Sequence, residues 1–155
     1  MNTEKVINHI VKWMIEYKKS SNCNGFILGI SGGIDSALTS TLCAKTNLPT
    51  LCLSLPIYQE KEQLQRAENH MRWLKEKFKN TSCLDVTLDS AYEAIKSTFF
   101  SQDRSKNHLA LANTKARIRM MTLYYYAQIN NLIVIGTGNK IEDFGIGFFT
   151  KYGDG

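Results

Sequence analysis

The sequence lacks the features that mark several classes of protein. Its four cysteines stand apart without a C-x-x-C pair, so metal or redox roles for them have no support. No apolar run reaches membrane-spanning length, and the N-terminus has no signal-peptide core. There is no low-complexity linker and no internal repeat. We therefore expect a cytoplasmic protein with reduced thiols and no membrane contact.

The bulk composition leaves a globular domain as the simplest interpretation. The chain has 155 residues, of which 43% are hydrophobic and 21% are charged, which is ordinary globular composition rather than disorder. Its net charge of +5 is compatible with a nucleic acid, but it suits a polyphosphate ligand equally well. Charge alone does not decide between these partners.

The apolar pattern predicts alternating strands and helices. The expected strands are 25–30, 50–55, 84–87 and 132–136. The expected helices are one near the N-terminus, one ending near 46, and those at 60–79, 90–99 and 107–130. Asn2 or Thr3 is expected to cap the first helix, and Asp89 or Ser90 the fourth. Alternation with almost fully apolar strands predicts an α/β fold, a parallel sheet with helices on both faces.

Residues 29–36 carry the strongest functional signal. They read Gly-Ile-Ser-Gly-Gly-Ile-Asp-Ser, after a predicted strand and before a predicted helix. Backbone N–H groups and the helix dipole make such a turn an anion site. Gly32 and Gly33 allow close approach of a phosphate, Ser31 and Ser36 add hydroxyl donors, and Asp35 offers a hard oxygen ligand to Mg²⁺. No Gly-Lys-Ser/Thr follows, so this is not a Walker-type loop.

Two weaker signals follow downstream. Asn113 and Arg117 lie four residues apart on one face of the 107–130 helix, with Lys115 and Arg119 elsewhere; a solvated basic helix is the alternative interpretation. Gly136-Thr137 directly follows the fourth strand and precedes carboxylates. His70 and His108 sit in polar helical surroundings, where we expect surface histidines rather than catalytic bases.

These segments together resemble one enzyme family. In order, SGG-x-DS, N-x-KAR-x-RM, GT with a following Glu, and GFFTKYGDG resemble ammonia-dependent NAD synthetase. The first motif alone is similar to the pyrophosphate loop of ATP-pyrophosphatases in general. The resemblance implies a Rossmann-like, adenine nucleotide alpha hydrolase-like fold. It also implies ATP-dependent adenylation of the deamido-NAD carboxylate, displacement of AMP by ammonia to give NAD, and release of pyrophosphate.

The resemblance also implies roles for individual residues, with ATP and Mg²⁺ as the cofactors. The implied ATP contacts are Gly29, Ser31, Gly32, Gly33, Ile34, Asp35, Ser36, Gln59 and Thr137. The implied deamido-NAD contacts are Asn113, Arg117, Phe148, Lys151 and Asp154. Asp35 and Glu142 are the implied Mg²⁺ ligands, although a longer spacing before Gly147 lets Asp143 compete with Glu142. No nucleophilic or general-base side chain is implied.

The remaining expectations concern assembly and alternatives. The family is dimeric, and the Tyr124–Tyr126 run points in several directions on a helix, so one tyrosine face can meet a partner. The chain ends inside the last motif, so we expect a single, C-terminally incomplete domain. Because no glutaminase domain precedes it, we expect free ammonia to be the nitrogen donor. Two alternatives remain: a tRNA-modifying ATP-pyrophosphatase, with nucleic acid as the less favoured partner, and a nucleotide-binding module without turnover.

Overall fold

The computed structural model describes residues 2–99, 104–147 and 149–153, with side chains at 104–106 left out of the description. Its helices are α1 (Thr3–Ser20), α2 (Ile34–Lys45), α3 (Lys61–Lys77), α4 (Asp89–Lys96), α5 (Arg104–Asn130) and the π-helix η1 (Ile141–Ile146). Its strands are β1 (Gly25–Gly29), β2 (Thr50–Ser54), β3 (Thr81–Asp85) and β4 (Leu132–Val134). Within these residues, no helix combines the length and apolar character that a bilayer crossing requires.

The strands form one parallel sheet in the order β3-β2-β1-β4. Residues 25–28 of the central strand β1 are buried, which explains why they read as an uninterrupted apolar run. The third strand occupies Thr81–Asp85, whereas the apolar pattern predicted 84–87. Pairing with Thr50–Ser54 sets its bounds. As an edge strand it tolerates polar residues, so its sequence gives a weak signal.

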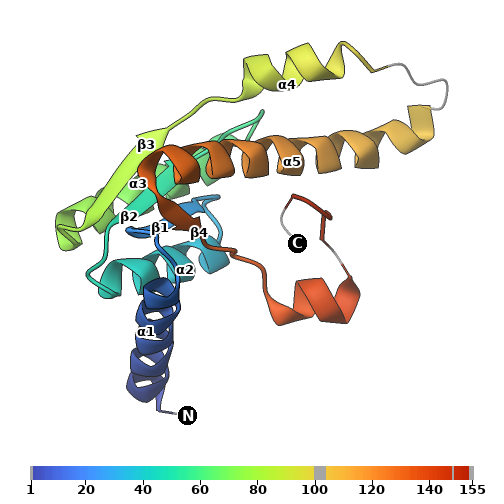
Figure 1. Ribbon diagram of the computed structural model, residues 1–155. Coiled ribbons are helices and arrows are strands. Elements are labelled where there is room, and N and C mark those ends of the chain that lie inside the picture. Colours follow the sequence, from blue (N-terminus) through green and yellow to red (C-terminus); the bar gives the residue numbers. More distant parts are fainter. Residues whose placement is uncertain (1, 100–103, 148, 154–155) are drawn as a thin grey trace.

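Helices cover both faces of the sheet, which confirms the predicted architecture (Figure 1). On one face, α1, α2 and α3 pack against Phe26, Leu28 and Cys52 in a first core. On the other face, α4 and α5 pack against Ile27 and Leu53 in a second core. The carboxyl ends of the strands therefore open between α2 and α3 on one side and α5 on the other, where open parallel sheets bind ligands.

The expected helix caps have mixed outcomes. Asn2 caps α1 as predicted, because its Oδ1 accepts a hydrogen bond from the Lys5 N–H at 3.1 Å. The cap predicted for α4 is wrong: Leu88 occupies the cap position, without a side-chain hydrogen bond. Asp89 instead accepts a hydrogen bond from the Tyr58 N–H at 2.7 Å. The Asp89 carboxylate thus binds the backbone of the connection that follows β2 and does not cap its own helix.

Two further boundaries differ from the prediction. Helix α5 begins at Arg104, three residues before the start predicted at 107. The π-helix after β4 was not predicted, and its glycine-containing sequence Ile-Glu-Asp-Phe-Gly-Ile has no clear helical pattern. This π-helix begins just after the polar loop that leaves β4.

Candidate nucleotide-binding site

The glycine-rich loop between β1 and α2 is organised by its two serines. Ser36 Oγ accepts a hydrogen bond from the Ser31 N–H at 3.2 Å and donates one to the Gly33 carbonyl at 3.0 Å. Ser31 Oγ accepts a hydrogen bond from the Gly33 N–H at 3.2 Å. Only 2% of Ser36 is exposed, so this serine shapes the loop from within, while Ser31 is exposed.

Helix α3 and the connection before it support the same loop. The Gln59 amide donates to the Ser31 carbonyl at 2.8 Å, and Arg66 Nε donates to the Gly32 carbonyl at 3.1 Å. Gly32 has a φ of 84°, and a Cβ there would collide with the Gln63 carbonyl oxygen, so only glycine fits this position. The loop's carbonyls are thereby tied back at two positions, as an anion-binding loop requires.

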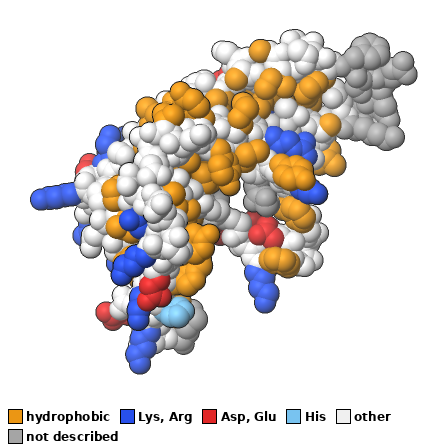
Figure 2. All heavy atoms as spheres, in the orientation of Figure 1, with side chains coloured by type: hydrophobic (Ala, Val, Ile, Leu, Met, Phe, Trp, Pro, Cys, Tyr) orange, Lys and Arg blue, Asp and Glu red, His pale blue; other side chains and the backbone are white. Residues whose placement is uncertain are grey.

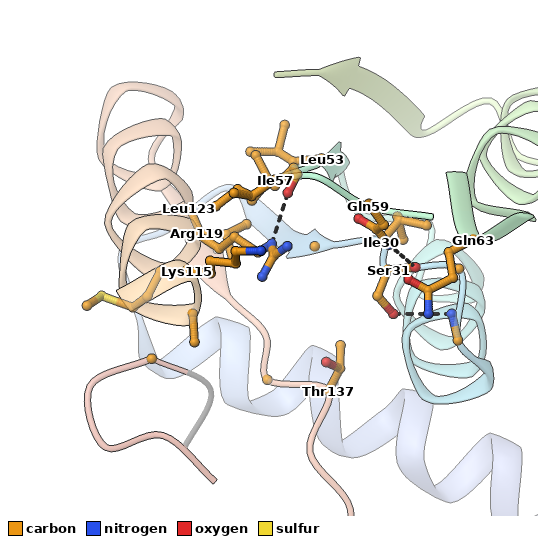
Figure 3. Close-up of a pocket in the computed structure, with 18 of the residues that line it drawn as sticks. Ile30, Ser31, Leu53, Ile57, Gln59, Gln63, Lys115, Arg119, Leu123 and Thr137 are labelled. Atoms are coloured by element: carbon orange, nitrogen blue, oxygen red, sulfur yellow. Dashed lines mark hydrogen bonds between the residues drawn. The ribbon is translucent and has the colours of Figure 1, made fainter. Parts of the chain in front are cut away.

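A cavity of about 1080 Å³ lies between this loop and α5. Figure 3 shows Ser31 and Gln59 on one side and Lys115 and Arg119 of α5 on the other. Leu53, Leu55, Ile57 and Leu123 supply an apolar floor. The charged side chains among the described residues that line the cavity are three cations and one carboxylate, namely Arg66, Lys115, Arg119 and Glu60. An apolar floor, an anion-binding loop and a cationic surplus suit a nucleotide with a phosphate chain.

The structure brings together about half of the sequence-predicted residues in this cavity. Those that line it are Gly29, Ser31, Gly32, Gly33, Gln59 and Thr137. The other implied ATP contacts, Ile34, Asp35 and Ser36, do not line it; 78% of Ile34 is exposed at the start of α2. Phe148 and Asp154 lie outside the described residues. Thr137 reaches the cavity because it follows the carboxyl end of β4, beside the end of β1.

Asp35 and Glu142 are connected through a residue that the sequence did not single out. Asn139 Nδ2 lies 3.4 Å from Asp35 Oδ2. Asn139 Oδ1 accepts hydrogen bonds from the N–H groups of Ile141 and Glu142 at 3.0 and 3.1 Å. Glu142 is exposed, whereas Asp143 is half-buried and its carboxylate packs against Gly138. Asn139 therefore ties the start of η1 to the glycine-rich loop.

This arrangement suits a cation that is shared with a ligand. No group of three or more His, Cys, Asp or Glu side chains in the described residues forms a complete metal cage. Mg²⁺ is commonly held by one or two carboxylates together with substrate phosphates. The half-buried Asp35, at the base of a phosphate-binding loop, fits that mode of coordination.

Asn113 and Arg117 share a face of α5, as the spacing predicts, but that face does not line the cavity. Asn113 Oδ1 accepts a hydrogen bond from Thr150 Oγ1 at 2.9 Å, and Arg117 Nε donates to the Lys151 carbonyl at 3.2 Å. The two residues hold the 150–153 segment so that Tyr152 and Gly153 reach the cavity rim. Lys151 Nζ lies over the Tyr152 ring, 4.9 Å from its centroid.

The cations of α5 that do line the cavity are Lys115 and Arg119, for which the sequence left a solvated basic helix as the alternative. Their four-residue spacing places them on one face, and that spacing is the only signal that could have identified them. Arg119 Nε donates to the Leu55 carbonyl at 2.9 Å. Arg66 and Tyr58 also line the cavity. They were not predicted from the sequence, because neither belongs to a local motif.

His70 is not the surface histidine that the sequence predicts. Its Nε2 lies 2.8 Å from Ser40 Oγ, and its ring stacks on Trp73. Ser40 is fully buried, and its hydroxyl also lies 3.0 Å from the Ala37 carbonyl oxygen, so it contacts both its own helix and His70. Burial lowers the pKa of His70 from its ordinary value of 6.5. The ring lies away from the cavity lining, so its role is in packing.

The fold and site together define an α/β domain with a parallel sheet and a glycine-rich loop, suited to a phosphate, at the carboxyl end of its first strand. The family model described as NAD synthase matches residues 6–155. The chain belongs to the NAD synthase family.

The relatives of this chain agree with that assignment. The NH(3)-dependent NAD(+) synthetase of Syntrophomonas wolfei is 38% identical over 157 residues, covering 99% of this chain and 61% of the relative. An NMN synthetase structure from Francisella tularensis matches with a TM-score of 0.87 and 36% identity, over 99% of this chain and 61% of that one. The structure of an NH3-dependent NAD synthetase from Campylobacter jejuni matches with a TM-score of 0.87 and 33% identity. The match covers 99% of this chain and 64% of the Campylobacter jejuni chain.

The match covers nearly all of this chain but only part of each relative. Against the curated synthetases of Syntrophomonas wolfei and Carboxydothermus hydrogenoformans, the chain spans 61% and 62% of the relative's length. The glycine-rich loop, the basic helix α5 and the Thr137 strand end all fall within this shared part.

Proposed function

We propose that this chain carries the ATP site and part of the deamido-NAD site of an ammonia-dependent NAD synthetase, in a single domain. The reaction is adenylation of the deamido-NAD carboxylate by ATP, followed by attack of ammonia to form NAD, AMP and pyrophosphate. The observation that carries the proposal is the cavity that joins the glycine-rich loop, Thr137 and the cationic side of α5. We place this chemistry in the cytoplasm, where ATP is abundant.

The residues favour the adenylation step through positioning and charge. Attack on the α-phosphate builds negative charge on its oxygens and on the leaving pyrophosphate. The glycine-rich loop before α2 lies on one side of the cavity and Lys115 and Arg119 lie on the other, so the dipole of α2 and the two cations are suited to stabilise that charge. The reaction needs no nucleophilic side chain, because the substrate carboxylate and ammonia are themselves the nucleophiles.

Mg²⁺ enters the proposal through Asp35, with Glu142 as a second carboxylate. A bound Mg²⁺ would neutralise phosphate charge and make pyrophosphate a better leaving group. Asn139 supports this assignment because it contacts Asp35 and orders the first turn of η1, which contains Glu142. Asp143 packs against Gly138 instead, so we keep Glu142 as the expected ligand.

A second candidate substrate follows from the likeness to the Francisella tularensis NMN synthetase. By its name, that enzyme makes the mononucleotide product rather than the dinucleotide. Nicotinic acid mononucleotide carries the same carboxylate as deamido-NAD, so the same adenylation chemistry applies to it. We favour deamido-NAD because the relatives at 34–38% identity are named NAD(+) synthetases.

We also propose that the protein acts as a homodimer. The support is an apolar stretch along α5, where Met121, Tyr124, Tyr125 and Ile129 are each more than half exposed. Figure 2 shows many hydrophobic side chains, coloured orange, on this face of the molecule. Tyr126, between them and the core, packs inward. Light scattering at micromolar concentration tests this proposal, and a purely monomeric mass would count against it.

The experiment that tests the function measures NAD formation from ATP, Mg²⁺, deamido-NAD and ammonium, with AMP followed in parallel. Nicotinic acid mononucleotide replaces deamido-NAD in a second arm, and calorimetry measures binding of ATP with Mg²⁺. We expect NAD and AMP in equal amounts. ATP binding without AMP would support the nucleotide-binding module instead. An absence of both binding and turnover would overturn the assignment of this cavity to ATP.

A further inference from the structure

Lys115 differs from the other cations of the cavity in what surrounds its ammonium group. Lys115 Nζ lies 5.8 Å from the ring centroid of Tyr58 and 5.2 Å from that of Tyr92. The two rings meet edge to face, with centroids 6.1 Å apart. Both ammonium–ring distances fall in the range of cation–π interactions. The two rings therefore form an aromatic seat for this one cation.

The aromatic seat is built by segments outside every recognised motif. Tyr92 comes from α4 and is only 4% exposed. Tyr58 comes from the connection after β2, where it adopts a φ of 48° that a bulky residue rarely takes. Asp89, the first residue of α4, accepts the Tyr58 N–H at 2.7 Å and so anchors this unusual backbone. Packing of Tyr92 and the Asp89 hydrogen bond together fix where the rings lie.

Among the described residues, no carboxylate forms an ion pair with Lys115. Within the part of the chain that the structure describes, the ion pairs are Lys12–Glu16 and Lys96–Glu93, and neither involves Lys115. Aromatic faces attract an ammonium but leave its full charge available. Lys115 borders the cavity together with Arg66 and Arg119, and Glu60 is the one carboxylate among the described residues that line it. A positioned cation in such a setting is suited to an anionic ligand.

We propose that Lys115 binds a phosphate group of the nucleotide in the cavity, and that Tyr58 and Tyr92 are positioning residues that hold its ammonium for that contact. The inference rests on the proposed function for the identity of the nucleotide. The phosphate belongs either to ATP or to the dinucleotide. Lys115 lies on α5, across the cavity from the Ser31 loop (Figure 3), so it reaches the phosphate from the opposite side.

The test measures binding to the full chain by calorimetry. ATP with Mg²⁺, deamido-NAD and adenosine are titrated separately, each at several salt concentrations. We expect Lys115→Gln to weaken one of the two phosphate ligands about tenfold or more, as loss of a charged hydrogen bond does, and to reduce its salt dependence. Adenosine has no phosphate, so its affinity should not change. The ligand that loses affinity identifies the source of the phosphate.

The positioning role is tested by coupling the substitutions. Tyr92→Leu should weaken the same ligand severalfold in the wild-type background and have no effect when combined with Lys115→Gln. Tyr92→Phe should restore binding because it keeps the ring. Tyr58→Leu repeats the test at a residue that is 59% exposed, in case the buried Tyr92 variant fails to fold.

Lys96→Gln is the matched control. Lys96 Nζ lies 5.7 Å from the centroid of the same Tyr92 ring, but it pairs with Glu93 at 3.1 Å and does not line the cavity. Nucleotide affinity should therefore be unchanged. If Lys115→Gln binds both phosphate ligands as tightly as the wild type, this inference is overturned and the proposed function is not. The same holds if the tyrosine variants lose equal affinity with and without Lys115. A wild-type chain that binds neither phosphate ligand would overturn the proposed function, and this inference with it.

Discussion

Asn139 and Asp35 meet at 3.4 Å between the Asn139 amide nitrogen and a carboxylate oxygen of Asp35, although 104 positions separate them in sequence. The contact joins two polar loops that follow neighbouring strands, β1 and β4. It fixes the Asp35 carboxylate from the side, and the other end of the Asn139 amide orders the first turn of η1. One amide thus links the Asp35 carboxylate to the backbone of Glu142.

Asp35→Asn should remove the Mg²⁺ dependence of ATP binding. The carboxylate is the hard, charged oxygen ligand at the glycine-rich loop, and an amide oxygen replaces it poorly. We expect ATP affinity in saturating Mg²⁺ to fall to the value measured without Mg²⁺. Calorimetry with and without the cation checks this. A variant that keeps the full Mg²⁺ response would place the metal elsewhere.

Glu142→Gln and Asp143→Asn distinguish the two candidates for the second carboxylate. If Glu142 holds the cation, its loss should weaken Mg²⁺ binding in the presence of ATP by at least about tenfold, the loss typical of removing even an outer-shell partner. Asp143 packs against Gly138, so Asp143→Asn should leave that affinity close to wild type. The reverse result would transfer the assignment to Asp143. Mg²⁺ titrations at fixed ATP measure both.

Gly32→Ala should damage the loop, whereas Gly136→Ala should not. A side chain at the φ of 84° costs about 1–2 kcal/mol, and the new Cβ would also collide with the Gln63 carbonyl oxygen. We expect a lower melting temperature and at least a tenfold loss of ATP affinity, by the usual relation of energy to affinity. A Cβ at Gly136 meets nothing within 4 Å, so Gly136→Ala is the control for the melting temperature; Gly136 itself lines the cavity, so the control does not extend to ATP affinity. Equal behaviour of the two variants would refute this account of the loop.

Much of the fold could be predicted because local pattern and burial agree. Residues 25–28 and most of β2 are buried, so an apolar run directly reports a central strand. β3 lies at the sheet edge, where Thr81 and Ser82 are acceptable, and only pairing with β2 reveals its start. The shift of α5 to Arg104 and the π-helix after β4 also escaped prediction, since neither has a decisive periodicity.

The site was predictable where one continuous segment builds it. The glycine-rich loop combines strand end, turn and helix start within eight residues, so its chemistry is visible in the sequence. Lys115 and Asn139 act through contacts with residues far away in sequence, Tyr92 and Asp35. Periodicity showed that Lys115 and Arg119 share a face of α5 but not that this face borders the cavity. Such roles depend on tertiary packing, which a single sequence does not display.

His70 should make the free energy of unfolding depend on pH. Burial lowers its pKa from 6.5, so the unfolded chain binds a proton more readily than the folded one. The contribution of neutral His70 is therefore complete above pH 6.5 and is lost as pH falls through the lower folded pKa. His70→Gln keeps an amide that can hydrogen-bond Ser40 Oγ without titrating in this range, and it should flatten the stability profile below pH 6.5. Denaturant unfolding from pH 8 to pH 5 measures the difference, with the exposed His108→Gln as control; an equally steep profile in His70→Gln would assign the pH dependence to other groups.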